Sequence, residues 1–144
     1  MKLRKLLAGV PLTEEEFDGG LEISSLSYDS RTLEPGALFV ALPGAKTDGS
    51  RFIDQAMERG AAVLCEHPPE RPGPWLTTPD ARLALALTSA NWFGHPGKEM
   101  TLIAVTGTNG KTTTTCLIKE MLEQTLSVPV GLVGTNRNLV GQRE

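Results

Sequence analysis

Apolar residues occur along this chain in short blocks, and the spacing inside each block predicts its conformation. Leu3, Leu6 and Leu7 are spaced as on one face of a short first helix. Residues 21–28 alternate between apolar and polar, as in a strand. The continuous apolar run over 37–42 is typical of a strand that is buried on both faces.

Helices and short strands continue to alternate up to residue 93. Apolar residues at helical spacing over 52–57 predict a helix that ends at Gly60. Asp80 is a suitable N-cap for a further helix over 81–93. Two short strands are predicted over 61–65 and 75–77. This alternation predicts an α/β fold.

Glycine and proline residues over 94–98 predict a domain boundary. Residues 1–97 would then form a small α/β domain, and 98–144 would begin a second one. In that second part we expect the first β-α-β unit of a larger sheet. A strand is predicted over 101–106, a helix over 112–125 and a strand over 128–133. Because one such unit cannot cover both faces of its sheet, the chain is expected to be a fragment of a longer protein.

The chemically most informative stretch joins the predicted strand 101–106 to the helix after it. It reads Thr-Gly-Thr-Asn-Gly-Lys-Thr-Thr-Thr-Thr over 106–115. Glycines allow close backbone approach, helix N-terminal amides favour anions, and Lys111 adds a mobile cation. These features predict a phosphate loop, with Gly107 standing closer to Gly110 than in the general pattern. The plainer alternative is a glycine-rich turn with an ordinary surface lysine; Thr114 and Thr115 are expected to pack or cap.

Composition excludes several other classes of function. The 144 residues carry a formal net charge of −3 without a cluster of Lys and Arg, which argues against nucleic-acid binding. No apolar stretch is long enough to span a membrane. The two cysteines, Cys65 and Cys116, have no nearby metal-ligand spacing. Low cysteine use fits a reducing compartment, and a cytoplasmic location is expected.

Three stretches together resemble the Mur ligase family. The phosphate loop over 106–114 is similar to the family's ATP loop. Asp29-Ser30-Arg31, followed by Pro-Gly-Ala-Leu-Phe-Val-Ala-Leu-Pro-Gly over 35–44, resembles its N-terminal substrate domain. Gly-Leu-Val-Gly-Thr over 131–135 resembles the strand after the ATP-loop helix. The block after Asp29 favours the branch that adds the third amino acid to a muramoyl dipeptide.

The resemblance implies ATP-dependent amide formation in peptidoglycan biosynthesis. A substrate carboxylate would attack the γ-phosphate of ATP, and the amine of diaminopimelate or lysine would displace phosphate from the acyl phosphate. The implied substrates are UDP-MurNAc-dipeptide, ATP and the amino acid, and the implied metal ion is Mg²⁺. The protein is expected to be a monomer. The family's further metal ligands and its amino-acid site lie beyond these residues, so the fragment alone is expected to be inactive.

Particular residues receive roles from the resemblance. The UDP-MurNAc contacts would be Tyr28, Ser30, Ala45, Lys46 and Thr47. The ATP contacts would be Gly107, Thr108, Asn109, Gly110, Lys111, Thr112 and Thr113, with Lys111 catalytic and Thr112 on Mg²⁺. Plainer alternatives remain for four side chains: a turn cap for Ser30, packing for Tyr28, an ion pair for Arg31 and a solvated lysine at 46.

Two other functions stay open at this point. One is a nucleotide-sugar-binding module without ligase chemistry. The other is a related ligase of the folylpolyglutamate type, because the ATP loop is shared with those enzymes. The residues after Thr135 depart from the family's usual continuation, since Asn136-Arg137-Asn138 replaces a small apolar residue and a glycine.

Overall fold

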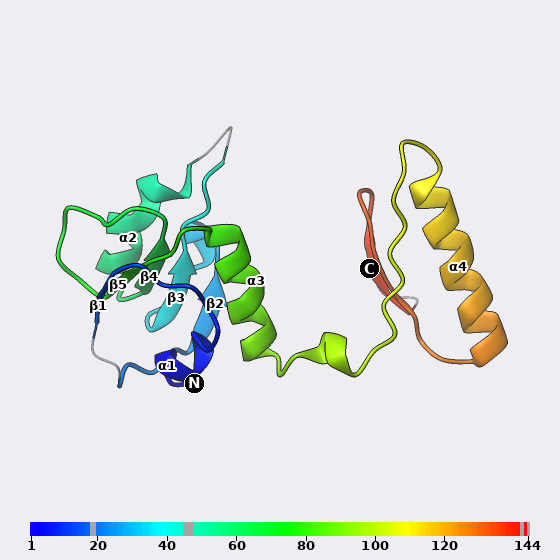
Figure 1. Ribbon diagram of the computed structural model, residues 1–144, viewed down its shortest axis with the longest axis horizontal. Helices are drawn as coiled ribbons and strands as arrows, with labels where there is room; N and C mark the ends of the chain where they lie inside the picture. The colour runs from blue at the N-terminus through cyan, green and yellow to red at the C-terminus, as the bar shows by residue number, and fades with distance from the viewer. Residues whose placement is uncertain (18–19, 45–47, 142, 144) are drawn as a thin grey trace. The chain divides into compact units, whose positions relative to one another are not determined.

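The chain divides into two compact units, Met1–Met100 and Thr101–Glu144 (Figure 1). The computed structural model describes residues 1–17, 20–44, 48–141 and 143. The boundary predicted at 97/98 falls inside a short 3-10 turn, η3 (Pro96–Lys98), just before the division. Among the described residues, no helix combines the length and apolar character needed to cross a bilayer.

The first unit is built around a five-stranded sheet in the order β1-β5-β4-β3-β2. Its strands are β1 (Glu15–Glu16), β2 (Ser25–Ser27), β3 (Ala37–Val40), β4 (Ala62–Cys65) and β5 (Trp75–Thr77). The four strands from β2 to β5 run parallel, whereas β1 pairs antiparallel with β5. The predicted α/β class is therefore confirmed, with a mainly parallel sheet.

Helices cover both faces of this sheet. They are α1 (Leu3–Leu6), α2 (Ile53–Glu58) and α3 (Ala81–Trp92). Alternate residues of β3 feed two separate cores: Leu38 and Val40 pack with residues of α1 and α3, and Phe39 packs with residues of α2. All four residues of β3 are buried, as the continuous apolar run predicts.

The ends of the helices follow local sequence signals. The Asp80 carboxylate accepts hydrogen bonds from the Arg82 and Leu83 amides, both at 2.9 Å, and so caps α3 as predicted. A 3-10 turn, η2 (Gly49–Phe52), leads directly into α2. Beyond α2, Gly60 has a φ of +78°, which favours glycine there.

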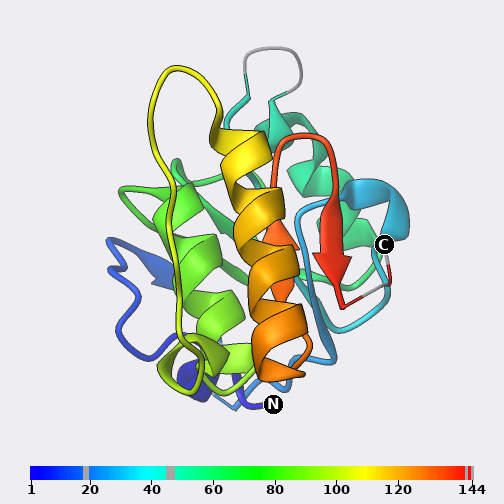
Figure 2. The same ribbon diagram turned by 90° about the vertical axis from the view of Figure 1, so that its right-hand side faces the viewer.

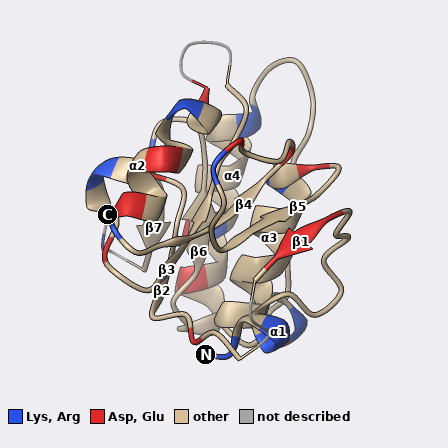
Figure 3. Cartoon of the chain, turned by 90° about the vertical axis from the view of Figure 1, so that its left-hand side faces the viewer, with Lys and Arg blue, Asp and Glu red and all other residues tan. Residues whose placement is uncertain are grey.

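The edges of the sheet differ from the sequence prediction. The strand expected over 21–28 is reduced to β2, whose residues are only half-buried. The pattern of apolar residues gives no sign of β1, because its two residues are both glutamates. They pair through the main chain with Trp75 and Leu76 and present a charged edge, drawn red in Figure 3.

The second unit consists of α4 (Lys111–Leu126) and a hairpin of β6 (Gly131–Val133) with β7 (Asn138–Val140). The predicted helix and the strand after it are present, with shifted ends. The strand predicted over 101–106 is not formed, because no neighbouring strand pairs with it among the described residues. Leu102 is 73% exposed, so this apolar segment is not buried as a central strand would be.

Removal of the α3 cap tests how this helix is held. We expect Asp80→Ala to lower the free energy of unfolding by about 1 kcal/mol, because two first-turn amides lose their acceptor. Asp80→Ser retains a capping oxygen and is expected to recover most of the loss. Urea denaturation measures both variants; equal stability of Asp80→Ala and the wild type would contradict the prediction.

Candidate functional site

The predicted phosphate loop has the backbone geometry that its two glycines allow. Gly107 has a φ of +140° and Gly110 a φ of +76°, conformations that residues with a side chain rarely adopt. Gly110 immediately precedes α4 and occupies its N-cap position. The loop therefore delivers the chain directly into the first turn of a 16-residue helix.

The first turn of α4 presents free backbone donors. The first helical hydrogen bond runs from the Thr114 amide to the Gly110 carbonyl, at 2.9 Å. Within the described part of the chain, the amides of Lys111, Thr112 and Thr113 donate no hydrogen bond. All three residues are exposed. Helix N-terminal amides in this state, together with the helix dipole, form a binding site for an anion such as phosphate.

The charged and hydroxyl side chains of the loop are already ordered. The Lys111 ammonium donates to the Gly107 carbonyl at 2.6 Å, so the cation lies over the loop and keeps two further N–H donors. Thr115 Oγ1 donates back to the carbonyls of Lys111 and Thr112, each at 3.0 Å. This contact confirms that Thr115 has a local structural role.

A cleft of about 310 Å³ lies beside the loop. One wall comes from the first two turns of α4, including Lys111, Thr112 and Cys116. The opposite wall is the turn over 134–137 that joins β6 to β7. Figures 1 and 2 show this turn at the same end of the unit as the start of α4. No Asp or Glu stands among the described residues that line the cleft, so its charged groups are cations.

The 134–137 turn is the part of the site that the sequence analysis did not assign. Thr135 and Arg137 line the cleft, although they lie more than twenty residues after the loop. Their position follows from a general property of α/β units: the residues that follow a strand end near the start of the preceding helix. That rule, applied to the predicted strand over 128–133, would have pointed to them.

Thr112 offers the chemistry that a magnesium ion requires. Thr112 lines the cleft, and its hydroxyl is of the hard oxygen type that Mg²⁺ prefers as a ligand. Among the described residues no cluster of three or more His, Cys, Asp or Glu side chains is placed to hold a metal. The chain therefore fits a metal ion that arrives with a nucleotide and takes one ligand from Thr112.

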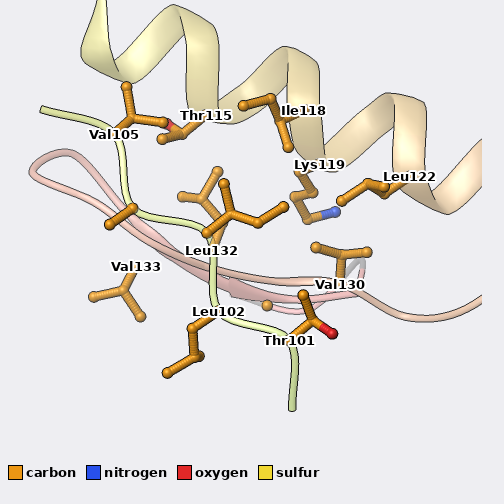
Figure 4. Close-up of a pocket in the computed structure, with 13 residues that line it drawn as sticks. Thr101, Leu102, Val105, Thr115, Ile118, Lys119, Leu122, Val130, Leu132 and Val133 are labelled. Carbon is orange, nitrogen blue, oxygen red and sulfur yellow. The ribbon is translucent and has the colours of Figure 1, made fainter. Parts of the chain in front are cut away.

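A second, more apolar cavity of about 280 Å³ separates segment 101–105 from α4 and β6 (Figure 4). Lys119 is 8% exposed in its wall, and its ammonium contacts the Glu123 carboxylate at 2.6 Å. Glu123 also accepts from the Val130 amide at 3.1 Å, and these two contacts, Lys119 foremost, lower the pKa of its carboxyl. The pair thereby links α4 to the start of β6 and keeps the buried lysine compensated.

In the first unit, the predicted substrate residues follow neighbouring parallel strands. Tyr28 and Ser30 come directly after β2, and residues 43–48 come after β3. The carboxyl ends of adjacent parallel strands share one edge of a sheet, where ligands bind in α/β folds. Tyr28 is 66% exposed and belongs to neither core, and its role in binding stays a prediction. Ala45, Lys46 and Thr47 lie outside the described residues.

The turn that carries Ser30 is held by its neighbours. The 3-10 turn η1 (Ser30–Thr32) begins with Ser30, and its cap is Asp29, which accepts from the Arg31 amide. Arg59 donates to the Ser30 carbonyl at 2.9 Å and fixes the turn against the end of α2. Ser30 itself is 8% exposed, and its role in binding stays a prediction.

Arg31 forms the ion pair that was the plainer alternative for it. Its guanidinium contacts both Asp29 carboxylate oxygens, the shortest distance being 2.6 Å. This contact, with the Arg31 amide, lowers the pKa of Asp29 to about 2. Because the Arg31 side chain is 86% exposed, the pair organises the turn more than it stabilises the fold.

The loop after β3 is closed by a tight main-chain approach. The Gly49 amide donates to the Leu42 carbonyl at 2.9 Å. A Cβ at position 49 would lie 2.7 Å from the Leu42 amide nitrogen and 2.8 Å from its carbonyl oxygen. Position 49 therefore requires glycine. The Asp48 carboxylate caps the turn that follows by accepting from the Ser50 amide at 3.0 Å.

These features define an α/β protein with a glycine-rich loop that leads into a helix and leaves its first three amides free. Two protein-family models match this chain: "Mur ligase family, catalytic domain" over residues 22–86 and "Mur ligase middle domain" over residues 105–143. The chain belongs to the Mur ligase family, whose members are ATP-dependent peptide ligases.

Curated relatives and solved structures agree with this assignment. A diaminopimelate-adding UDP-N-acetylmuramoyl-L-alanyl-D-glutamate ligase of Syntrophomonas wolfei is 49% identical over 147 residues, covering 99% of this chain and 29% of the relative. A UDP-N-acetylmuramyl-tripeptide synthetase of a Roseiflexus species is 48% identical, covering 85% of this chain and 25% of the relative. The chain thus spans less than a third of the length of these relatives.

Two solved structures are similar in fold. One, a UDP-N-acetylmuramoyl-L-alanyl-D-glutamate–2,6-diaminopimelate ligase, has a TM-score of 0.68 and 28% identity, covering 89% of this chain and 27% of the other. The MurF ligase of Thermotoga maritima in complex with ADP has a TM-score of 0.55 and 27% identity, covering 73% and 24%.

The Asp29–Arg31 pair has a measurable pH signature. The folded-state pKa of Asp29 is about 2, below the ordinary 3.8, so the contribution of the pair is present above 3.8 and is lost as pH falls through about 2. We expect Arg31→Gln to raise the pKa of Asp29 toward 3.8. Side-chain carboxyl NMR measures it, with Arg71→Gln as the control. Titration of wild-type Asp29 near the ordinary value would contradict the prediction.

The close approach at Gly49 predicts a selective cost. Gly49→Ala forces the main chain of Leu42 to shift, and we expect a loss of about 1–3 kcal/mol in unfolding free energy. Gly73→Ala is a matched control, because its Cβ would meet only the flexible Met57 side chain. Thermal denaturation compares the two variants; an equal or larger loss in Gly73→Ala would refute the argument.

Proposed function

We propose that the chain is the N-terminal part of an ATP-dependent ligase that adds the third amino acid to UDP-N-acetylmuramoyl-L-alanyl-D-glutamate. The observation that carries the proposal is the phosphate loop, with three free helix amides and Lys111 placed over it. Similarity to muramoyl tripeptide ligases over 99% of the chain supports the substrate class.

In this proposal each of the two units binds a different substrate. Residues 1–97 bind UDP-MurNAc-dipeptide through Tyr28, Ser30 and residues 45–47. Residues 98–144 begin the ATP-binding domain, in which Gly107–Thr113 hold the phosphates. The exposure of Tyr28 after β2 and the cation-lined cleft beside α4 support these two assignments.

The proposed chemistry needs positioning and charge neutralisation more than covalent work by the protein. The substrate carboxylate attacks the γ-phosphate, ADP leaves, and an acyl phosphate forms. The amine of the incoming amino acid then attacks the acyl carbon, and inorganic phosphate leaves as the amide bond forms. Lys111 stabilises the charge on the transferred phosphoryl group, and its contact with the Gly107 carbonyl holds the ammonium ready. Mg²⁺, when bound through Thr112, supplies further charge neutralisation.

The incoming amino acid is proposed to be 2,6-diaminopimelate. The names of several relatives support this choice over lysine. Phosphate release by the complete ligase distinguishes the functions: it should require ATP, UDP-MurNAc-dipeptide and diaminopimelate together. Binding of the UDP substrate without phosphate release would favour a nucleotide-sugar-binding module. Turnover with a folate substrate instead would favour a folylpolyglutamate-type ligase.

Lys111 gives the sharpest mutational test of the ATP site. We expect Lys111→Ala to lower the turnover number of the complete ligase by about 100-fold, because a cation is lost where charge develops. Lys98→Ala, an exposed lysine outside the loop, serves as the control. A steady-state phosphate-release assay measures both, and normal turnover by Lys111→Ala would reject the proposed role.

Ser30 gives the corresponding test of the UDP-MurNAc site. We expect Ser30→Ala to raise KM for the UDP-linked substrate by about tenfold, the effect of one lost hydrogen bond, while KM for ATP stays the same. The same assay, run with each substrate varied in turn, provides its own control. Equal changes in both KM values would indicate a general structural defect rather than a lost substrate contact.

A further inference from the structure

The cleft beside the phosphate loop has a second cation that the family resemblance does not assign. Arg137 stands in the 134–137 turn, on the wall opposite Lys111 and the first turn of α4. It is exposed, and within the described residues its guanidinium forms no ion pair. The described lining of the cleft contains no carboxylate. This guanidinium is therefore free to attract an anion into the cleft.

The turn that carries Arg137 is held in a defined conformation. Its two ends are the last paired positions of the hairpin, Val133 opposite Asn138. The Gly134 amide also donates to the Asn138 side-chain oxygen at 3.3 Å, which closes the turn. Arg137 therefore projects from a short, hydrogen-bonded connection rather than from a long free loop, and less ordering is needed when it binds.

The start of β6 is in turn fixed to α4. The Glu123 carboxylate accepts from the Val130 amide at 3.1 Å and from Lys119 at 2.6 Å. The strand that leads to the turn is thus tied to the same helix whose first turn forms the opposite wall. Both walls of the cleft therefore belong to elements that are hydrogen-bonded to each other.

We propose that Arg137 binds an oxyanion from the side opposite Lys111 and the helix amides, so that the reacting group is held between two cations. This inference rests on the proposed ligase function. The oxyanion is either the terminal phosphate of ATP or the substrate carboxylate that attacks it. The planar guanidinium suits either one, because it donates two parallel hydrogen bonds to adjacent oxygens, which an ammonium cannot do.

The test compares Arg137→Gln with the matched variant Arg143→Gln in the complete ligase. Arg143 lies in the same unit, contacts Val140 only through its main chain in the described residues, and does not line the cleft. Calorimetric binding of Mg·ATP is measured without the acceptor, and KM is measured for UDP-MurNAc-dipeptide. We expect Arg137→Gln to weaken one of these by about tenfold, while Arg143→Gln leaves both unchanged.

The two arms identify the source of the oxyanion. Weaker Mg·ATP binding assigns Arg137 to the terminal phosphate, and a higher KM for the acceptor with normal Mg·ATP binding assigns it to the carboxylate. Arg137→Lys keeps the charge but not the paired donors, so it should recover only part of the loss and confirms that the variants are folded. If Arg137→Gln matches Arg143→Gln in both arms, the inference is overturned.

Lys111→Ala keeps this result separate from the proposed function. Loss of Mg·ATP binding in Lys111→Ala with no effect of Arg137→Gln would leave the ligase proposal standing and reject only the role of Arg137. Absence of Mg·ATP binding in the unsubstituted complete ligase would reject the ATP site itself.

Discussion

The first unit depends on strands that are buried on both faces. Along β3, Leu38 and Val40 face one core while Phe39 faces the other, so helices must cover both sides of the sheet. The helix α2, which connects β3 to β4, covers one face, and α1 and α3, which flank the strands in the sequence, cover the other. The same topology brings the ends of β2 and β3 to one edge, where Tyr28 and Ser30 lie and where the chain between Leu42 and Gly49 is closed.

The second unit satisfies the same constraint only in part. Its helix α4 covers one face of the β6–β7 hairpin, while Val133 is 90% exposed. Segment 101–105 lies across a cavity from α4 and β6 and pairs with no strand among the described residues. The glycine loop and the first turn of α4 nevertheless have a defined conformation, because local backbone geometry is enough to fix it.

The two lysines of α4, Lys111 and Lys119, have different surroundings. At its start, exposed amides and Lys111 face a cleft whose described lining contains no carboxylate, as binding of a polyphosphate requires. At the middle of the helix, Lys119 is buried but paired with Glu123, so this cation has a structural role. The two lysines are of one residue type on one helix, and their surroundings give them different roles. Membership of the Mur ligase family agrees with the ATP-binding role proposed for the first.

The sequence by itself determined most of the elements and the loop, because local rules decide them. A continuous apolar run predicts β3, a capping carboxylate at Asp80 marks the start of α3, and glycines supply the positive φ angles at 107 and 110. The sequence did not predict correctly the strands whose formation depends on a pairing partner. Residues 101–106 have an apolar pattern yet form no strand, while the glutamates of β1 form one through main-chain pairing alone. The cleft between Lys111 and Arg137 was likewise decided only by tertiary structure, since the hairpin brings together residues that no local pattern connects.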